Sequence, residues 1–355
     1  MPAPPHHHDH GNGLHHDQAA AVDEHDHEGG LLAAIRHLVA PHSHDHAAAI
    51  DSATANREGM RAVVISLAAL LATASVQAVV VALSGSVALV ADTVHNFSDA
   101  LTALPLGVAL WLGRRPANRR YTYGYGRAED LAGIFIVATI ALSAGLAAWQ
   151  AVTRLVDPQA IEHAGWVAAA GVVGFAGNEL VALYRIRVGR RIGSAALVAD
   201  GLHARTDGLT SLGVIAAAAG SMAGLELADP IVGLVISVAI LNVLRHAVRD
   251  IYRRLMDRVD PGLVDQLEHE LGHTAGVIDV DRVRVRWIGH ELHADAEVAL
   301  DPTLDLAAAH DVLEEARHRL LHNVPRLADI LLHANPAGHP QAHDRTNHHL
   351  HPPAT

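Results

Sequence analysis

The sequence predicts an α-helical membrane protein in which six transmembrane helices form an inverted three-plus-three repeat, followed by a C-terminal cytoplasmic α+β domain. Three observations carry this prediction. Half of the 355 residues are apolar although only 3% are aromatic, and the apolar residues gather in long blocks. Arginines flank alternate connections between these blocks, and two of the blocks contain copies of one motif.

The apolar blocks are each close to the roughly 20 residues that a helix needs to cross a ~30 Å hydrocarbon layer. They cover residues 61–83, 87–112, 131–153, 164–184, 195–220 and 229–247. The buried core of a soluble helical protein is the alternative, but soluble domains do not supply so many stretches of this length. We therefore expect a six-helix transmembrane domain over residues 57–250.

The arginines give the expected orientation in the membrane. They precede the first span and follow the second, fourth and sixth spans, whereas the opposite connections contain only Arg154. The flanking residues are Arg57, Arg61, Arg114, Arg115, Arg119, Arg120, Arg127, Arg185, Arg187, Arg190, Arg191, Arg245, Arg249, Arg253, Arg254 and Arg258. The positive-inside rule then places both termini in the cytoplasm of a multi-pass protein of the cell membrane.

Both ends of the chain are rich in histidine. Residues 1–56 and 337–355 have little hydrophobic periodicity, so we expect disordered cytoplasmic tails that bind metal loosely. The first 30 residues contain no apolar segment of the kind found in a signal peptide. The whole chain has 29 histidines and no cysteine, so any metal must be held by His, Asp, Glu or carbonyl oxygen.

Residues 258–336 have the pattern of a small α+β regulatory domain. Amphipathic stretches predict helices from Pro261 to about residue 273 and over 306–322. Alternating stretches predict strands over about 279–288, 292–300 and 327–333. The resulting α-β-β-α-β order predicts a compact unit beneath the membrane.

The internal repeat is the most informative feature of the sequence. ALVADTVHNFSDALT at 88–102 aligns without a gap with ALVADGLHARTDGLT at 196–210, an offset of 108 residues. The corresponding polar residues are Asp92, His95 and Asp99 in the second span and Asp200, His203 and Asp207 in the fifth. In each copy they fall at i, i+3 and i+7 on one helical face. Because the two spans run in opposite directions, we expect the His/Asp pairs to meet near the middle of the bilayer.

Two imidazoles and two carboxylates, from His95, Asp99, His203 and Asp207, can form a four-coordinate tetrahedral zinc site. One such H-x-x-x-D pair alone is weak evidence. Its duplication at hydrocarbon depth, where a charge is unfavourable by at least roughly 2.5–3.5 kcal/mol, favours a function. We expect Arg205 to pair with Glu179 or to extend inward.

Asp92 and Asp200 lie one turn beyond the histidines. They are either accessory groups that guide the ion or solvated acids at helix ends. The residue pattern leaves both readings open.

The chain resembles the cation diffusion facilitator family over about residues 57–335. The matching segments are SVALVADTVHNFSD, RRYTYGYGRAED and ADGLHARTDGLTSLGV. The resemblance implies a homodimer that exports divalent metal in exchange for protons, with a ferredoxin-like cytoplasmic domain that binds metal and regulates transport. It also implies that His95, Asp99, His203 and Asp207 bind Zn²⁺ as the transported substrate, since family members with H-x-x-x-D in both helices are associated with zinc.

Two features depart from the family pattern. The His-rich loop between the fourth and fifth spans is missing, and the ending LLHANP has Asn335 where the family has Asp. His310 and His333 remain candidate ligands of a cytoplasmic metal site. The prediction is thus a transporter and not an enzyme, with a lipid bilayer, metal ions and a second copy of the chain as partners and no nucleic acid.

Other motifs in the sequence point to other functions. WIGHELH resembles a metalloprotease helix, but His290 and His293 are three residues apart rather than four. The pairs His269/His273 and His318/His322 have the spacing of a surface zinc clip, although such pairs are more often solvated helix faces. A membrane-anchored metal sensor or buffer acting through the tails, and an intramembrane metal-dependent hydrolase, are the alternative functions.

Overall fold

The computed structural model describes residues 52–84, 97, 101–156, 164–225 and 228–339. Its elements belong to one compact unit that starts at Ala47. Most of the expected tails over 1–56 and 337–355, namely residues 1–51 and 340–355, lies outside the described residues.

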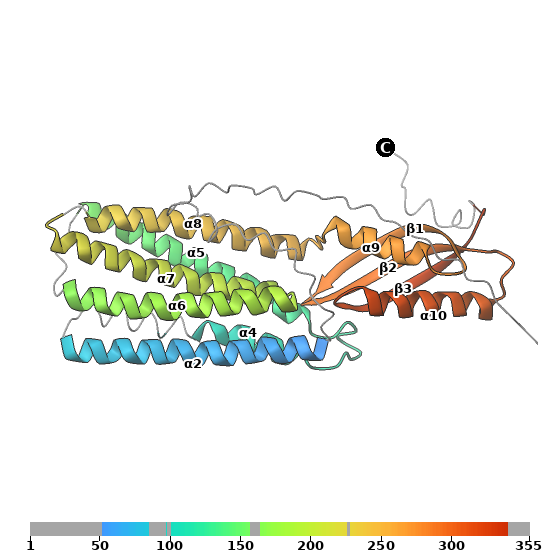
Figure 1. Ribbon diagram of the computed structural model, residues 1–355, viewed down its shortest axis with the longest axis horizontal. Coiled ribbons are helices and arrows are strands. Elements are labelled where there is room, and N and C mark those ends of the chain that lie inside the picture. The colour runs from blue at the N-terminus through green and yellow to red at the C-terminus, as the bar shows by residue number, and fades with distance from the viewer. Residues whose placement is uncertain (1–51, 85–96, 98–100, 157–163, 226–227, 340–355) are drawn as a thin grey trace, which may run out of the picture. The chain divides into compact units, whose positions relative to one another are not determined.

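Six helices precede the C-terminal domain in the described part of the chain (Figure 1). They are α2 (Ser52–Ser84), α4 (Ala103–Gly113), α5 (Arg127–Val156), α6 (Ala164–Ile192), α7 (Ala195–Met222) and α8 (Ala228–Leu255). The helix α6 packs against α2 and α7, and α8 packs against α5 and α7. The helix α7 is therefore covered from several sides.

Four of these helices, α2, α5, α6 and α8, are long and apolar enough to cross a membrane. The helix α7 has 28 residues, but it carries the polar residues of the repeat, which lower its hydropathy. The helix α4 is a shorter apolar helix, and most of the expected second span before it lies outside the described residues. The six-span count and the inverted repeat therefore stay predictions.

The outer surface of the helical bundle is apolar. Large side chains such as Leu142 (65% exposed), Trp149 (70%) and Leu180 (69%) point outward. Patches of this kind are rare on soluble monomers, and they suit a surface that faces lipid tails.

The helices extend beyond the apolar blocks. The helix α2 begins at Ser52, not at residue 57, and Arg57 bonds back to the carbonyl oxygen of Ala53 and the hydroxyl of Thr54. The helices α6 and α8 likewise continue through their arginines to Ile192 and Leu255. The apolar blocks end where the arginines begin. Arginine is nevertheless a good helix former, so the helices continue through these residues.

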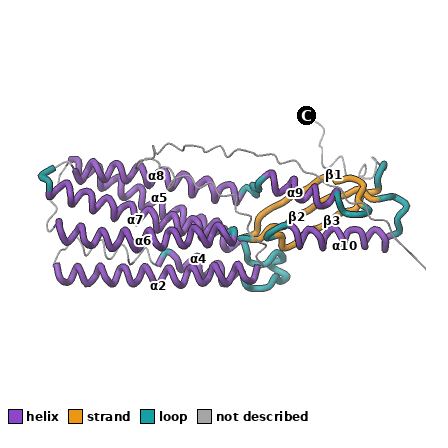
Figure 2. The backbone as a smooth tube through the Cα atoms, in the orientation of Figure 1, coloured by secondary structure: helices purple, strands orange, loops and turns teal. Residues whose placement is uncertain are grey.

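The C-terminal domain has the α-β-β-α-β order expected from the sequence. Its elements are α9 (Pro261–Gly272), β1 (Val277–Ile288), β2 (Glu291–Leu300), α10 (Leu306–Asn323) and β3 (Leu327–Pro336). Strand β2 lies between β1 and β3 (Figure 2). It pairs antiparallel with β1 and parallel with β3. Both helices contribute to one apolar core with the sheet, through residues such as Leu267, Leu320 and Val298.

Candidate metal centre

The helix α7 carries one half of the expected site. His203 and Asp207 are separated by one turn, and Nε2 of His203 lies 3.9 Å from Oδ2 of Asp207. The two residues are only 2% and 7% exposed. The hydroxyl of Thr206 donates to the carbonyl oxygen of His203 at 2.7 Å and contacts Oδ1 of Asp207 at 3.4 Å. The structure thus holds a nitrogen and an oxygen donor together in the bundle interior.

Local sequence explains the position of this half-site. Ser194 caps α7 by accepting a hydrogen bond from the amide of Leu197 at 3.0 Å. Further along, Gly201 lets α7 approach α6, because a Cβ atom there would lie 2.7 Å from Cγ1 of Ile186 and 3.0 Å from its backbone nitrogen. Small residues permit this close packing of membrane helices.

Asp200, one turn before His203, is paired with an arginine of α6. Nη1 of Arg185 lies 3.1 Å from Oδ2 of Asp200, and the side chains are 1% and 0% exposed. Neither the Nε nor the Nη2 atom of Arg185 has a hydrogen-bond partner among the described residues. A buried ion pair with unused donors adds little net stability, because desolvation offsets much of the attraction. Sequence reasoning assigned Arg185 to a cytoplasmic flank and so missed this pair.

The expected pairing of Arg205 with Glu179 is confirmed. Nη2 and Nε of Arg205 donate to the two carboxylate oxygens of Glu179 at 2.7 and 3.2 Å. This fork geometry uses both oxygens and neutralises a charge inside the bundle. The pair therefore links α6 to α7 a second time, close to the half-site.

The second half of the expected site is not described. His95 and Asp99, together with the accessory candidate Asp92, lie outside the described residues. The structure therefore does not test whether they meet His203 and Asp207. Within the described ranges, no group of three or more His, Asp or Glu side chains converges as metal ligands.

In the C-terminal domain, His310 on α10 and His333 on β3 are both exposed. The amide of Asn335 donates to Oδ2 of Asp281 at 2.8 Å. The residue that departs from the family pattern thus donates a hydrogen bond to an acid within β1.

A contact that sequence reasoning missed joins the bundle to the C-terminal domain. The turn between β1 and β2 places His290 against the first turn of α5, where its Nδ1 lies 2.9 Å from a carboxylate oxygen of Glu129. Both side chains are buried. Arg254 of α8 donates to the carbonyl oxygens of Gly193 and Gly289 and stacks on Trp287, 3.8 Å from the ring centroid. No local pattern could reveal a pair 161 residues apart.

Comparison with known proteins adds to this geometry. Residues 63–256 match the model of the cation efflux transmembrane domain, and residues 259–337 match that of the cation efflux protein cytoplasmic domain. A probable cation efflux system protein of Mycobacterium tuberculosis is 59% identical over 317 residues, covering 89% of this chain and 96% of that protein.

More distant relatives differ in what their names specify. A rice protein named metal tolerance protein 2 (Oryza sativa subsp. japonica) is 29% identical, covering 71% of this chain and 72% of that protein. A manganese efflux system protein of Bacillus subtilis is 24% identical, covering 71% of this chain and 87% of that protein.

The match covers the bundle with its buried His/Asp pair and the α+β domain that follows it. The protein is therefore a multi-pass membrane transporter for efflux of divalent metal cations, and it belongs to the cation diffusion facilitator family.

Proposed function

We propose that this protein exports Zn²⁺ in exchange for protons, through a tetrahedral site formed by His95, Asp99, His203 and Asp207. The observation that carries the proposal is the buried pair of His203 and Asp207, one turn apart on the covered helix α7. The gap-free repeat supplies the same residue types on the second span. Mixed nitrogen and oxygen donors favour zinc over ions that prefer oxygen alone.

Proton exchange follows from the chemistry of these ligands. Metal binds neutral imidazole and ionised carboxylate, so metal binding releases protons from a protonated site. Reprotonation on the other side of the membrane weakens the site and releases the ion. The substrate gradient and the proton gradient are then coupled through one set of side chains.

We also propose an orientation in the membrane and an oligomeric state. Both termini and the C-terminal domain lie on the cytoplasmic side of the cell membrane, in line with the arginine distribution. The chain acts as a homodimer, as the match to a cytoplasmic domain of the cation efflux type suggests. Asp92 and Asp200 are accessory to ion passage, and His310 and His333 are candidate ligands for regulatory metal.

Metal uptake into proteoliposomes that contain only this protein, under an imposed pH gradient, tests the site. We expect Asp207→Ala to nearly abolish Zn²⁺ flux, because a loss of one ligand leaves three donors and excess positive charge in the bundle. The matched control is Asp311→Ala, which removes an exposed acid of α10 and should keep the wild-type flux. Near-normal flux through folded Asp207→Ala would exclude the assigned site, and Zn²⁺ flux with no opposite movement of protons would exclude antiport.

Metal selectivity is tested by His95→Asp in the same vesicles. The change replaces one of two nitrogen donors by a carboxylate, so Mn²⁺ initial rates should rise relative to those of Zn²⁺. An unchanged ratio in a variant that still transports would show that His95 does not bind the transported ion. This comparison also addresses the distant manganese efflux relative, whose name specifies a different ion.

A further inference from the structure

A pair of histidines on α9 lies on the solvent-exposed side of the cytoplasmic domain. His269 and His273 are both exposed and one helical turn apart. Their ring centroids are 4.0 Å apart, with an angle of 38° between the ring planes. Side chains at i and i+4 are neighbours on a helix surface, so both imidazoles are available to one ion.

A hydrogen bond fixes which nitrogen of His273 is available. Its Nδ1 atom lies 2.7 Å from the carbonyl oxygen of His269. Since a carbonyl oxygen can only accept, Nδ1 carries the hydrogen, and the neutral ring presents the lone pair of Nε2 to solvent. Histidine ligands of metals commonly donate their second nitrogen to a carbonyl or carboxylate in this way.

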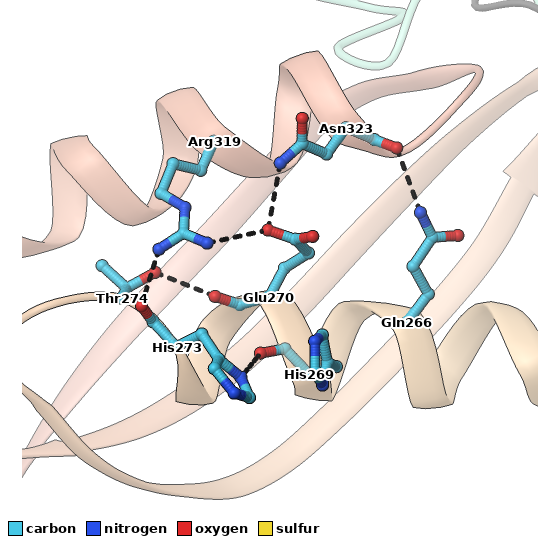
Figure 3. A network of polar contacts seen from close by, with 7 residues as sticks. All are labelled: Gln266, His269, Glu270, His273, Thr274, Arg319 and Asn323. Carbon is cyan, nitrogen blue, oxygen red and sulfur yellow. Dashed lines mark hydrogen bonds and ion pairs between the residues drawn. The ribbon is translucent and has the colours of Figure 1, made fainter. Parts of the chain in front are cut away.

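The helical turn that carries the pair is anchored to α10. Glu270 accepts hydrogen bonds from Nη2 of Arg319 and Nδ2 of Asn323, each at 3.0 Å (Figure 3). Nη1 of Arg319 also donates to the carbonyl oxygen of His273 at 2.7 Å. Because the backbone at both ends of the pair is held, an ion needs to order only the two rings.

We propose that His269 and His273 form a two-nitrogen binding site for a late first-row divalent cation such as Zn²⁺, separate from the transport site. No third His, Asp or Glu joins them among the described residues, so water completes the coordination. The site is therefore open and exchangeable. It binds metal on the cytoplasmic domain and cross-links the two ends of the last turn of α9.

The chain supplies a matched comparison on the adjacent helix. His318 and His322 of α10 have the same spacing, but their rings meet edge to face, 4.5 Å apart at 70°. Variants of this second pair keep the number of histidines equal to that in variants of the first. Differences between the two sets of variants then exclude a general effect of the His-rich tails.

The test is residue-resolved footprinting of full-length protein. Diethyl pyrocarbonate modifies accessible imidazoles, and mass spectrometry of the peptides that cover α9 reports protection as Zn²⁺ is added. We expect His269 and His273 to be protected at the same concentration. His269→Ala should shift protection of His273 to at least about tenfold higher Zn²⁺, because the second ligand supplies a high effective concentration. His318→Ala should leave it unchanged, and Mg²⁺ should not protect either ring.

The proposal fails if Zn²⁺ does not protect the pair in the wild type, or if His273 remains protected equally well in His269→Ala. His269 is exposed, so its replacement is expected to leave the fold intact. A thermal unfolding curve without metal checks this point. The footprint reports on α9 directly, so its result is independent of whether the transport site binds zinc or another ion.

Discussion

In the helical bundle, charged side chains lie buried between α6 and α7, whereas in the cytoplasmic domain they lie on the outer faces of α9 and α10. Arg185 and Asp200 are at most 1% exposed, while Leu142 and Trp149 of α5 are mostly exposed. In the cytoplasmic domain, Leu320 is fully buried. The surroundings decide this inversion: lipid tails accept apolar side chains, and water accepts charges.

The two regions therefore differ in where they can hold a metal ion. The buried polar residues of the bundle are too unfavourable to be present for packing alone, which supports the ion route proposed above. In the cytoplasmic domain the apolar core only holds the fold, and the proposed ligands His269 and His273 lie on its surface. Three substitutions probe this difference.

Removal of Arg185 should have the largest effect on the stability of the protein. Arg185→Ala leaves Asp200 buried without its partner, and breaking a buried pair in this way destabilises by roughly 3–5 kcal/mol. The measurement is thermal unfolding of the purified protein in detergent. The double variant Arg185→Met/Asp200→Asn should recover most of the loss. Equal stability of Arg185→Ala and wild type would mean that the pair is not needed in the bundle.

Disruption of the contact between the two regions should have an intermediate effect on stability. His290→Phe removes the hydrogen bond between His290 and Glu129 at the junction, and the loss of one partner from a buried carboxylate is unfavourable by about 1–3 kcal/mol. We expect a fall in the unfolding temperature of a few degrees and slower transport, with the fold of the cytoplasmic domain retained. His318→Phe, on the exposed face of α10, is the control with the same change of side chain. If both variants behave alike, the junction does not depend on His290.

The smallest effect is expected on the surface of the cytoplasmic domain. The hydrogen bond from Asn323, together with Arg319, holds the pKa of Glu270 below its ordinary value. Its stabilising contribution is thus present above the ordinary Glu pKa of about 4.3 and is lost as pH falls through the lower folded-state pKa. Glu270→Gln should lower the unfolding temperature by about 1–2 °C at neutral pH, with the difference vanishing in acid. A difference that persists unchanged at low pH would exclude the charge as its cause.

Features that repeat along the chain, or that recur with the period of a helix or a strand, could be predicted from the sequence. The order of elements in the cytoplasmic domain, the extent of α7 and the pairing of Arg205 with Glu179 could all be predicted. Helical period, strand alternation and the rarity of charge in a membrane supply these signals. The position of His203 and Asp207 on one helical face follows from the same spacing.

Features that depend on tertiary contacts could not be predicted. Arg185 had the sequence context of a cytoplasmic flank, and only the packing of α6 on α7 reveals its partner. His290 belonged to a motif that resembled a protease helix, yet it is held in a turn against Glu129. Neither contact has a local signature, because the partners come from segments that only the fold brings together.

The turn at Gly289 and His290 also has a consequence for biogenesis. Its contacts come from Glu129 at the start of α5 and from Arg254 at the end of α8, and Arg254 also donates to the carbonyl oxygen of Gly193 between α6 and α7. During synthesis the turn is made after all of these segments. The turn can therefore complete these contacts only when α5 and α8 have come together. A chain with a misplaced α8 would leave the carbonyl oxygen of Gly289 without its hydrogen bond from Arg254.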